Sequence, residues 1–555
     1  MGLFRLEAPT AYLRKAWCAG AHSTVRILLP HVLRNSATAD ECLVVAECCG
    51  LLKLDDLYAA SIRRAVALDR NCQPALIRLA CIASEQKDNV FAALALEEAA
   101  RCGPLPAGTE RMRLQLAAAE AEKLHPYRAI TGQIESETTD APLRMLLVTN
   151  LFPPQELGGY GRMMWEFARG LIARGHDVRI LTGDADYLAK APSEEETEME
   201  ARVYRTLTLT GGWGAGRINH AADKAKTAAI EASNASKVLQ ESFVFEPNLI
   251  LVGNLDLLGV SLVHTALYAG YHVLHAVANQ APGFSGKDQP SSSSYWMAPC
   301  SHWNGRALKE AGYEPERMVT LYPGARIDRF YRVFLADTQT LRIAYASIVA
   351  PYKGTHVLVE ALARLHATGL DFAAEIAGEA LDRPYADRLR EYCARNGMAG
   401  KVSFTGFLDR NSLSALFARS NVLVFPSQFD EPFGISQVEA MASGLVVVTS
   451  GTGGSAEVVR DGKDGLVFKA GDSGALAARL HLLATDQGVF QNLQNAGQRR
   501  AFSFSVDSSV RQLESLAGEL IEAGEGPSIE QAAVAELERD SYPPMFAQPT
   551  PAPLA

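Results

Sequence analysis

The chain has 555 residues, enough for three or four domains of ordinary size. With 48% hydrophobic and 21% charged residues, its composition is that of a folded globular protein, which excludes collagen-like and wholly disordered chains. The formal charge of −10 argues against a protein whose main task is to hold nucleic acid.

The chain also lacks obvious signals for membrane insertion or secretion. No apolar run reaches the roughly 18–20 residues of a membrane helix, and the N-terminal sequence MGLFRLEAPTAYLRKAW has no apolar signal-peptide core. The nine cysteines show no paired CxxC spacing, and seven of them fall within the first 102 residues. We therefore expect a cytoplasmic protein with reduced, mostly buried cysteines and no cysteine-based metal or redox site.

Residues 1–133 predict an all-α domain, because the pattern is helical and rich in Ala, Leu, Arg and Glu. Small residues recur there with a period of 34: Ala46 with Ala80, Cys49 with Ala83, Ile62 with Leu96, and Ala65 with Ala99. The period resembles that of tetratricopeptide repeats, with units near 39–72 and 73–106. Leu76 and Arg70 depart from that pattern, so a generic Ala-rich helical bundle is the alternative.

This helical region contains no catalytic motif, and we expect it to bind a protein partner. It is followed by the polar segment ESETTDAP, within residues 134–142, which is typical of a linker. At the other end of the chain, residues 525–555 are rich in Pro and predict a disordered tail.

From residue 145 onward, short apolar runs alternate with amphipathic helical patterns. Strands are predicted at 145–150, 177–182, 248–252, 271–276, 318–322, 341–348, 371–377, 401–404, 421–427 and 445–450. Helices are predicted between them, for example at 163–174, 222–242, 355–368, 382–396 and 473–485. Apolar strands that alternate with helices form parallel sheets covered on both faces. The α/β pattern therefore predicts two Rossmann-like domains, 143–332 and 333–524, with a return helix in the second and the ligand at the carboxyl ends of the strands.

The most informative segment is NVLVFPSQFDEPFGISQVEAMASG, residues 421–444. A buried strand is followed by a short loop, and Gly434 opens a helix. The first backbone amides, near Phe433, Gly434 and Ile435, have no intrahelical partner, so with the helix dipole they form an anion site.

Two carboxylates flank this anion site. Glu431 lies in the loop before the helix, and Glu439 lies about a turn and a half inside it. Both could reach one ligand over the helix N-terminus, at two different parts of it. The arrangement suits a diphosphate with polyhydroxylated groups on either side.

The segment EPFGISQVEAMASG resembles the Glu-x7-Glu signature of the retaining glycosyltransferases of family 4, which have the GT-B fold. Four further blocks, 150–183, 321–330, 350–365 and 451–468, occur in the family's order. They resemble its glycine loop with the following helix and strand, the segment that closes the first domain, the phosphate-binding lysine loop and the stretch after the signature helix. The resemblance covers about 145–520. It implies an enzyme with two Rossmann-like domains facing a cleft that transfers sugar from a nucleotide-diphosphate sugar to an acceptor, in glycan, polysaccharide or glycoconjugate synthesis.

The resemblance also implies roles for individual residues in the donor-side domain. Glu431 would contact the donor sugar near the reacting carbon, and Glu439 would bind both ribose hydroxyls. Lys353 would neutralise the leaving diphosphate, together with the helix N-terminus. No metal or other cofactor is implied, because lysine and backbone amides take that role and no Asp-x-Asp cluster stands at a strand end.

In the first domain, the resemblance implies that Gly158 and Gly159 allow the backbone to approach the diphosphate. His275, at the end of the strand predicted at 271–276, would be the active-site histidine beside the donor sugar. Taken alone, Lys353 would be a surface lysine, His275 an interior histidine and the two glycines a turn.

One position departs from the family pattern. The family usually has an arginine five residues before the lysine, and this chain has Ile348. Either Arg326 or Arg162 substitutes in donor binding, or donor binding is weakened. The alternative function is therefore a catalytically weak or inactive GT-B protein that acts as an interaction scaffold through its helical repeats.

Other enzyme classes fit less well. The segment GGYGRMMW lacks the third glycine of a dinucleotide fingerprint, no P-loop motif is present, and a glycosidase would place its two carboxylates across a sugar bond. The acceptor, the donor base and the donor sugar are not encoded in any motif. The helix that contains Arg162, Arg169 and Arg174 could touch a membrane surface, although a solvated face is the simpler interpretation.

Overall fold

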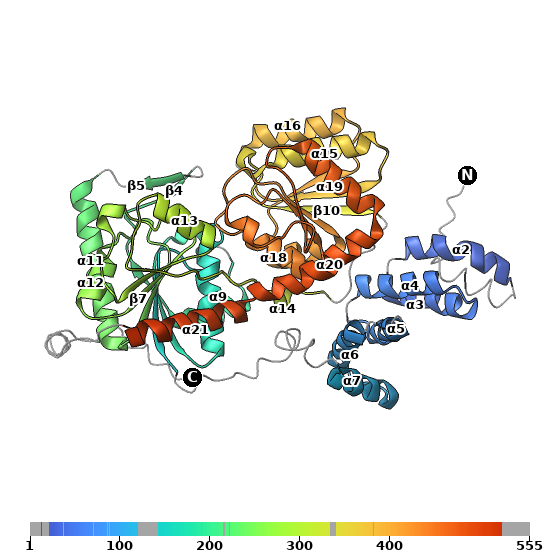
Figure 1. Ribbon diagram of the computed structural model, residues 1–555, viewed down its shortest axis with the longest axis horizontal. Helices are drawn as coiled ribbons and strands as arrows, with labels where there is room; N and C mark the ends of the chain where they lie inside the picture. The colour runs from blue at the N-terminus through green and yellow to red at the C-terminus, as the bar shows by residue number, and fades with distance from the viewer. Residues whose placement is uncertain are drawn as a thin grey trace, which may run out of the picture.

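The computed structural model describes residues 13, 21–36, 38–69, 71–85, 87, 89–119, 142–189, 191–214, 217–220, 223–332, 340–380 and 382–523. The predicted tail, the predicted linker up to residue 141 and Cys18 lie outside these residues. Figure 1 shows a group of N-terminal helices and two domains that each contain a sheet.

The N-terminal part is built from helix pairs at the predicted spacing. Its described helices are α2 (His22–Asn35), α3 (Ala39–Leu51), α4 (Asp55–Leu68), α5 (Gln73–Glu85), α6 (Asn89–Cys102) and α7 (Ala107–Ala119). Helices α5 and α6 start 34 residues after α3 and α4, since 73 − 39 and 89 − 55 both equal 34.

The positions that repeat in the sequence form the interior of these pairs. All eight are buried: Ala46, Cys49, Ile62, Ala65, Ala80, Ala83, Leu96 and Ala99. Small side chains there let paired helices approach closely. Six of the eight described cysteines are buried, as expected of most of them, and Cys81 and Cys102 are exposed. The assignment of the repeats to the tetratricopeptide class stays a prediction.

The first Rossmann-like domain is a seven-stranded parallel sheet in the order β3-β2-β1-β6-β7-β8-β9. Its strands are β1 (Arg144–Thr149), β2 (Asp177–Gly183), β3 (Val203–Leu207), β6 (Leu249–Val252), β7 (Val273–Val277), β8 (Tyr295–Pro299) and β9 (Arg317–Met318). Its main helices are α9 (Tyr160–Ala173), α11 (Lys224–Phe245), α12 (Ser261–Tyr268) and α13 (His302–Glu310), with the short α10 (Glu194–Met199). An antiparallel hairpin, β4 (Gly211–Gly214) and β5 (Arg217–His220), is inserted after β3.

The strands of this sheet are apolar on both faces. Met145 and Leu147 belong to the core beneath α9, whereas Leu146 and Val148 belong to the core beneath α11 and α12. Alternate residues of one strand point to opposite faces, so a run of apolar residues is what a doubly covered strand requires.

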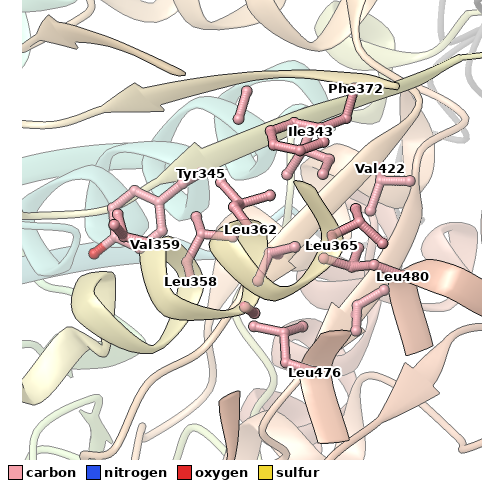
Figure 2. Close-up of a cluster of buried hydrophobic side chains, with 14 of the residues drawn as sticks. Ile343, Tyr345, Leu358, Val359, Leu362, Leu365, Phe372, Val422, Leu476 and Leu480 are labelled. Atoms are coloured by element: carbon pink, nitrogen blue, oxygen red, sulfur yellow. The ribbon is translucent and has the colours of Figure 1, made fainter. Parts of the chain in front are cut away.

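The second Rossmann-like domain is a six-stranded parallel sheet in the order β12-β11-β10-β13-β14-β15. Its strands are β10 (Leu341–Ala346), β11 (Phe372–Ala377), β12 (Val402–Gly406), β13 (Val422–Phe425), β14 (Val446–Thr449) and β15 (Leu466–Val467). Its helices are α14 (Ile327–Phe330), α15 (Thr355–Ala367), α16 (Arg383–Arg395), α17 (Arg410–Arg419), α18 (Ile435–Ala442), α19 (Ser473–Thr485) and α20 (Gln487–Ala501). In Figure 2, Leu358, Leu362 and Leu365 of α15 pack between the sheet residue Ile343 and Leu476 and Leu480 of α19.

The chain then crosses back to the first domain. Helix α21 (Val506–Ala523) packs beside α9, where Val510, Leu513 and Leu520 join the core of the first sheet (Figure 1). Gly170 of α9 allows this close contact, because a Cβ there would lie 2.5 Å from a methyl carbon of Val510.

Candidate active site

Loops that follow strands of the two sheets meet between the domains. From the first domain, Gln280 lies shortly after β7 and Ser301 shortly after β8; from the second, residues 430–432 follow β13. Gln280 Nε2 donates to the Asp430 carbonyl at 3.0 Å, and Ser301 Oγ donates to the Pro432 carbonyl at 2.7 Å. The carboxyl ends of strands therefore come together here, which is where Rossmann-like domains bind ligands.

Glu431 occupies the loop between β13 and α18, as predicted. Its side chain is buried, and Oε1 accepts from Lys353 Nζ at 2.6 Å and from Ser427 Oγ at 2.7 Å. The glycine that begins α18, Gly434, has φ +94°, and a Cβ there would lie 2.6 Å from Gln437 Nε2. A side chain at residue 434 would thus be strained and crowded, so glycine is required at this helix N-terminus.

Lys353 reaches Glu431 from a separate loop. It ends the 3-10 turn Pro351–Lys353, and Gly354 with φ +69° leads into α15. A Cβ on Gly354 would lie 1.8 Å from the Pro426 carbonyl, so this loop packs directly on the end of β13. The ammonium also lies 5.3 Å from the ring centroid of Phe429. The two residues predicted to act on the donor are thereby brought together.

Glu439 lies on α18 and is only 2% exposed. Its Oε1 forms an ion pair with the guanidinium of Arg410, the first residue of α17. Sequence reasoning missed Arg410. No local pattern signals this pair, because Arg410 and Glu439 lie 29 residues apart in the chain.

Gly158 and Gly159 lie in the exposed loop between β1 and α9. Gly158 has φ +73°, and a Cβ on either glycine would have no atom within 4 Å. Their backbone is therefore accessible. Phe433, by contrast, is buried against the rings of Tyr322 and Phe504 at 5.7 and 5.4 Å.

The structure does not bring His275 to this junction. The residue lies in the middle of β7, is fully buried, and its Nδ1 is 2.9 Å from the Tyr295 hydroxyl. Burial lowers the pKa of His275 to about 3, so the imidazole is neutral. Strand β7 extends to Val277, and the residue that actually contacts the Asp430 loop is Gln280. The structure therefore places His275 as an interior histidine of β7, and its role beside a donor stays a prediction.

The two arginines considered as replacements for the missing family arginine both have carboxylate partners. Arg326 pairs with Asp328 at 2.7 Å and Glu195 at 3.0 Å. Arg162 pairs with Glu196 at 2.6 Å, and with Glu156. Their charge is compensated within the protein, so the geometry does not support either of them as a donor ligand.

Ile348 is 37% exposed, so the position carries no buried structural role. Lys353 is the only basic residue in the described loop that contains it, so no second cation of this loop replaces the missing arginine. Of the residues predicted to bind the donor, the structure thus brings together Glu431 and Lys353 at the start of α18 and places Glu439 on the same helix.

Among the described residues, no helix is long and apolar enough to span a bilayer. No group of three or more His, Cys, Asp or Glu side chains in that part of the chain is arranged to hold a metal ion.

Comparison with known proteins gives consistent results. Residues 328–500 match the family model described as "Glycosyl transferases group 1". The chain is 28% identical over 382 residues to the glycogen synthase of Mycobacterium tuberculosis, which covers 65% of this chain and 91% of that protein. It is 28% identical over 309 residues to a D-inositol 3-phosphate glycosyltransferase of Salinispora arenicola, which covers 50% and 67%.

Among solved structures, Anabaena HepE in complex with UDP and glucose is similar with a TM-score of 0.52 at 20% identity, over 68% of this chain and 100% of that one. The chain has the GT-B fold. The family match and the named relatives support glycosyltransferase activity.

Proposed function

We propose that the chain is a retaining, metal-independent glycosyltransferase that uses a nucleotide-diphosphate sugar as donor. The observation that carries the proposal is the pairing of Lys353 with Glu431 at the N-terminus of α18, with Glu439 buried on the same helix. A lysine and unpaired helix amides stabilise negative charge that develops on a leaving diphosphate. Glu431 is the carboxylate next to that charge, and we assign it to the hydroxyls of the donor sugar.

Glu439 is assigned to the ribose. One of its oxygens is engaged by Arg410, and a carboxylate has enough lone pairs to accept ribose hydroxyls as well. On the first-domain side, the accessible backbone of Gly158 and Gly159 is assigned to the diphosphate. Phe433, Gly434 and Ile435 complete the donor-binding set through their backbone.

A thermal-shift panel of UDP, GDP and ADP, with their common sugar conjugates, tests the donor site. UDP-glucose is the first donor to include, because the similar HepE structure contains UDP and glucose. A ligand at about 100 times its Kd adds about 2.7 kcal/mol to stability, which should raise the Tm of the wild type clearly. In Glu439→Ala the same ligand should give little or no shift; an equal shift in both proteins would contradict the assignment of Glu439.

The stereochemical and metal assignments have separate tests. Product formed from an α-linked donor should keep the α configuration at the anomeric carbon by NMR, and an inverted product would contradict a retaining reaction. Turnover should persist after dialysis against EDTA. Loss of turnover that Mg²⁺ or Mn²⁺ restores would contradict metal independence.

The setting of the reaction is proposed on the same basis. We assign the enzyme to the cytoplasm, and residues 1–133 to recruitment of a protein partner. Removal of residues 1–133 should leave release of nucleoside diphosphate from the donor alone unchanged and lower transfer to the natural acceptor.

A second candidate function is an interaction scaffold with a weak or inactive GT-B body. Ile348 favours this second function, because Arg326 and Arg162, which could have replaced the missing arginine, are both already paired with carboxylates. In that case no member of the panel would shift the Tm, and partner binding would survive Glu431→Gln together with Lys353→Ala.

A further inference from the structure

The loop that carries Glu431 is held on both sides by the first domain. The Asp430 carbonyl accepts from Gln280, and the Pro432 carbonyl accepts from Ser301 Oγ at 2.7 Å. The two peptide groups that flank Glu431 are thus tied to side chains from the other domain.

A second tie runs in the opposite direction, from Glu457 of the second domain to helix α13 of the first. The Glu457 carboxylate accepts from the backbone N–H of His302 at 3.1 Å and of Trp303 at 2.6 Å. The next amide, of Asn304, donates to Ser301 Oγ at 3.0 Å. The opening amides of a helix have no intrahelical partner and carry the positive end of its dipole, so a carboxylate is well suited to this position.

The contact is closely packed as well as hydrogen-bonded. A Cβ on Gly454 would lie 2.0 Å from the Pro432 carbonyl and 2.5 Å from Ser301 Oγ, so only glycine fits between the two ties. The hydroxyl of Tyr322 donates to Glu457 at 2.8 Å. Gly454 N also donates to the Glu431 carbonyl, at 2.6 Å.

We propose that Ser301 and Glu457 form an interdomain clamp that fixes the Glu431 loop relative to the first domain. Both are positioning residues, because their contacts are with backbone groups and, for Glu457, with the Tyr322 hydroxyl, and not with reacting atoms. The effect on catalysis rests on the function proposed for Glu431, whereas the clamp itself does not. Docking of the two domains thereby sets the place of Glu431 against a donor that both domains hold.

Hydrogen exchange on the full-length chain without ligand tests the clamp directly. In Glu457→Ala, exchange in peptides that cover 302–303 should rise about tenfold or more, because these amides lose their acceptor although the substitution lies in the other domain. Glu457→Gln keeps one carbonyl acceptor and should give a smaller rise. Unchanged exchange at 302–303 in Glu457→Ala would overturn the proposal.

The matched control is Asp486→Ala. Asp486 caps α20 by accepting from Val489 N at 2.9 Å, entirely within the second domain. This variant should raise exchange only at the start of α20. Equal rises at 302–303 in both variants would show general loosening, and would also overturn the clamp.

A kinetic measurement with UDP-glucose tests the positioning role. In Glu457→Ala, kcat should fall about 10- to 100-fold with the donor KM changed less than about threefold, and Glu457→Gln should recover part of the loss. Increased exchange with an unchanged kcat would overturn the positioning role. A wild type that turns over no donor in the panel would contradict the proposed function, and the exchange result would still decide the clamp.

Discussion

Lys353 and Glu431 form a charge pair of opposite sign in a mostly buried place. Each compensates the other at 2.6 Å, which is necessary because an uncompensated buried charge is costly. A diphosphate at the N-terminus of α18 would give Lys353 a second anionic partner and would weaken its ion pair with Glu431. The ion pair therefore keeps the side chains of Lys353 and Glu431 in position until a donor binds.

Lys353→Ala should lower kcat about 100- to 1000-fold, because it removes a cation placed where diphosphate charge develops. The measurement is the release of nucleoside diphosphate at saturating donor. Lys463→Ala is the matched control, since Lys463 is an exposed lysine of the same domain. A kcat for Lys353→Ala equal to that of the control would refute the role.

His275 makes the stability of the first domain depend on pH. Its pKa in the folded protein is about 3, against about 6.5 in an unfolded chain, so only the unfolded state takes up the proton as the pH falls below 6.5. The stabilisation is complete above pH 6.5 and is lost on acidification at about 1.4 kcal/mol per pH unit.

His275→Gln should remove that slope between pH 6.5 and 5, although it lowers stability overall. Tryptophan fluorescence during denaturant unfolding is a suitable probe, because Trp165, Trp213, Trp296 and Trp303 all belong to the first domain. Identical pH dependence in wild type and variant would show that His275 is not the group responsible.

The sequence located Glu431, Lys353 and Glu439 because each belongs to a local pattern of strand, loop and helix. His275 lies in mid-strand and not at a strand end, because β7 runs one residue beyond the predicted end. Arg410 and Glu457 were missed for a different reason. Their partners lie 29 and about 155 residues away, and no local pattern records which distant groups will meet.

At the scale of elements, α21 joins the two domains by polar as well as apolar contacts. Glu514 Oε1 accepts from Arg174 Nε at 2.7 Å and lies 2.8 Å from His176 Nε2. The Nδ1 atom of His176 accepts from the Leu143 amide at the start of the first sheet. One carboxylate thus links the last described helix to the turn between α9 and β2.

Glu514→Ala should destabilise the docking of α21 by about 3 kcal/mol, because it removes the 2.7 Å ion pair that Glu514 forms with the mostly buried Arg174. Chemical denaturation followed by tryptophan fluorescence measures the loss. Glu519→Ala, on the exposed face of the same helix, should change stability by less than about 0.5 kcal/mol. Equal effects of the two substitutions would contradict the docking role.

Nine of the ten predicted strands are confirmed, since buried parallel strands are read from continuous apolar runs. The strand predicted at 318–322 overlaps the short edge strand β9 (Arg317–Met318) only at residue 318. Strands β3, β8 and β15 and the β4–β5 hairpin were not predicted. The edge strand β3 is half-buried and has a mixed sequence, so it lacks the apolar run on which the predictions relied. Strand β8, Tyr-Trp-Met-Ala-Pro, is apolar and fully buried, but it is short, follows a serine-rich loop and ends in a proline.

At the scale of the whole molecule, both domains contribute to the candidate site. The first supplies the side chains that hold residues 430–432, and the second supplies the carboxylates and Lys353. The helical N-terminal part of the chain is additional to these two domains. The GT-B fold was predictable because its α/β alternation is repeated twice, whereas the interdomain contacts depend on how two separately folded units dock.

The central claim is that Glu431 acts on a nucleotide-diphosphate sugar bound at α18. The most direct test is the rate of nucleoside-diphosphate release from UDP-, GDP- and ADP-sugars by the wild type and by Glu431→Gln. We predict release from one of these donor classes by the wild type, and a rate at least about 100-fold lower in Glu431→Gln with nucleotide binding retained. Release at the wild-type rate by Glu431→Gln, or by neither protein from any donor, would contradict the account.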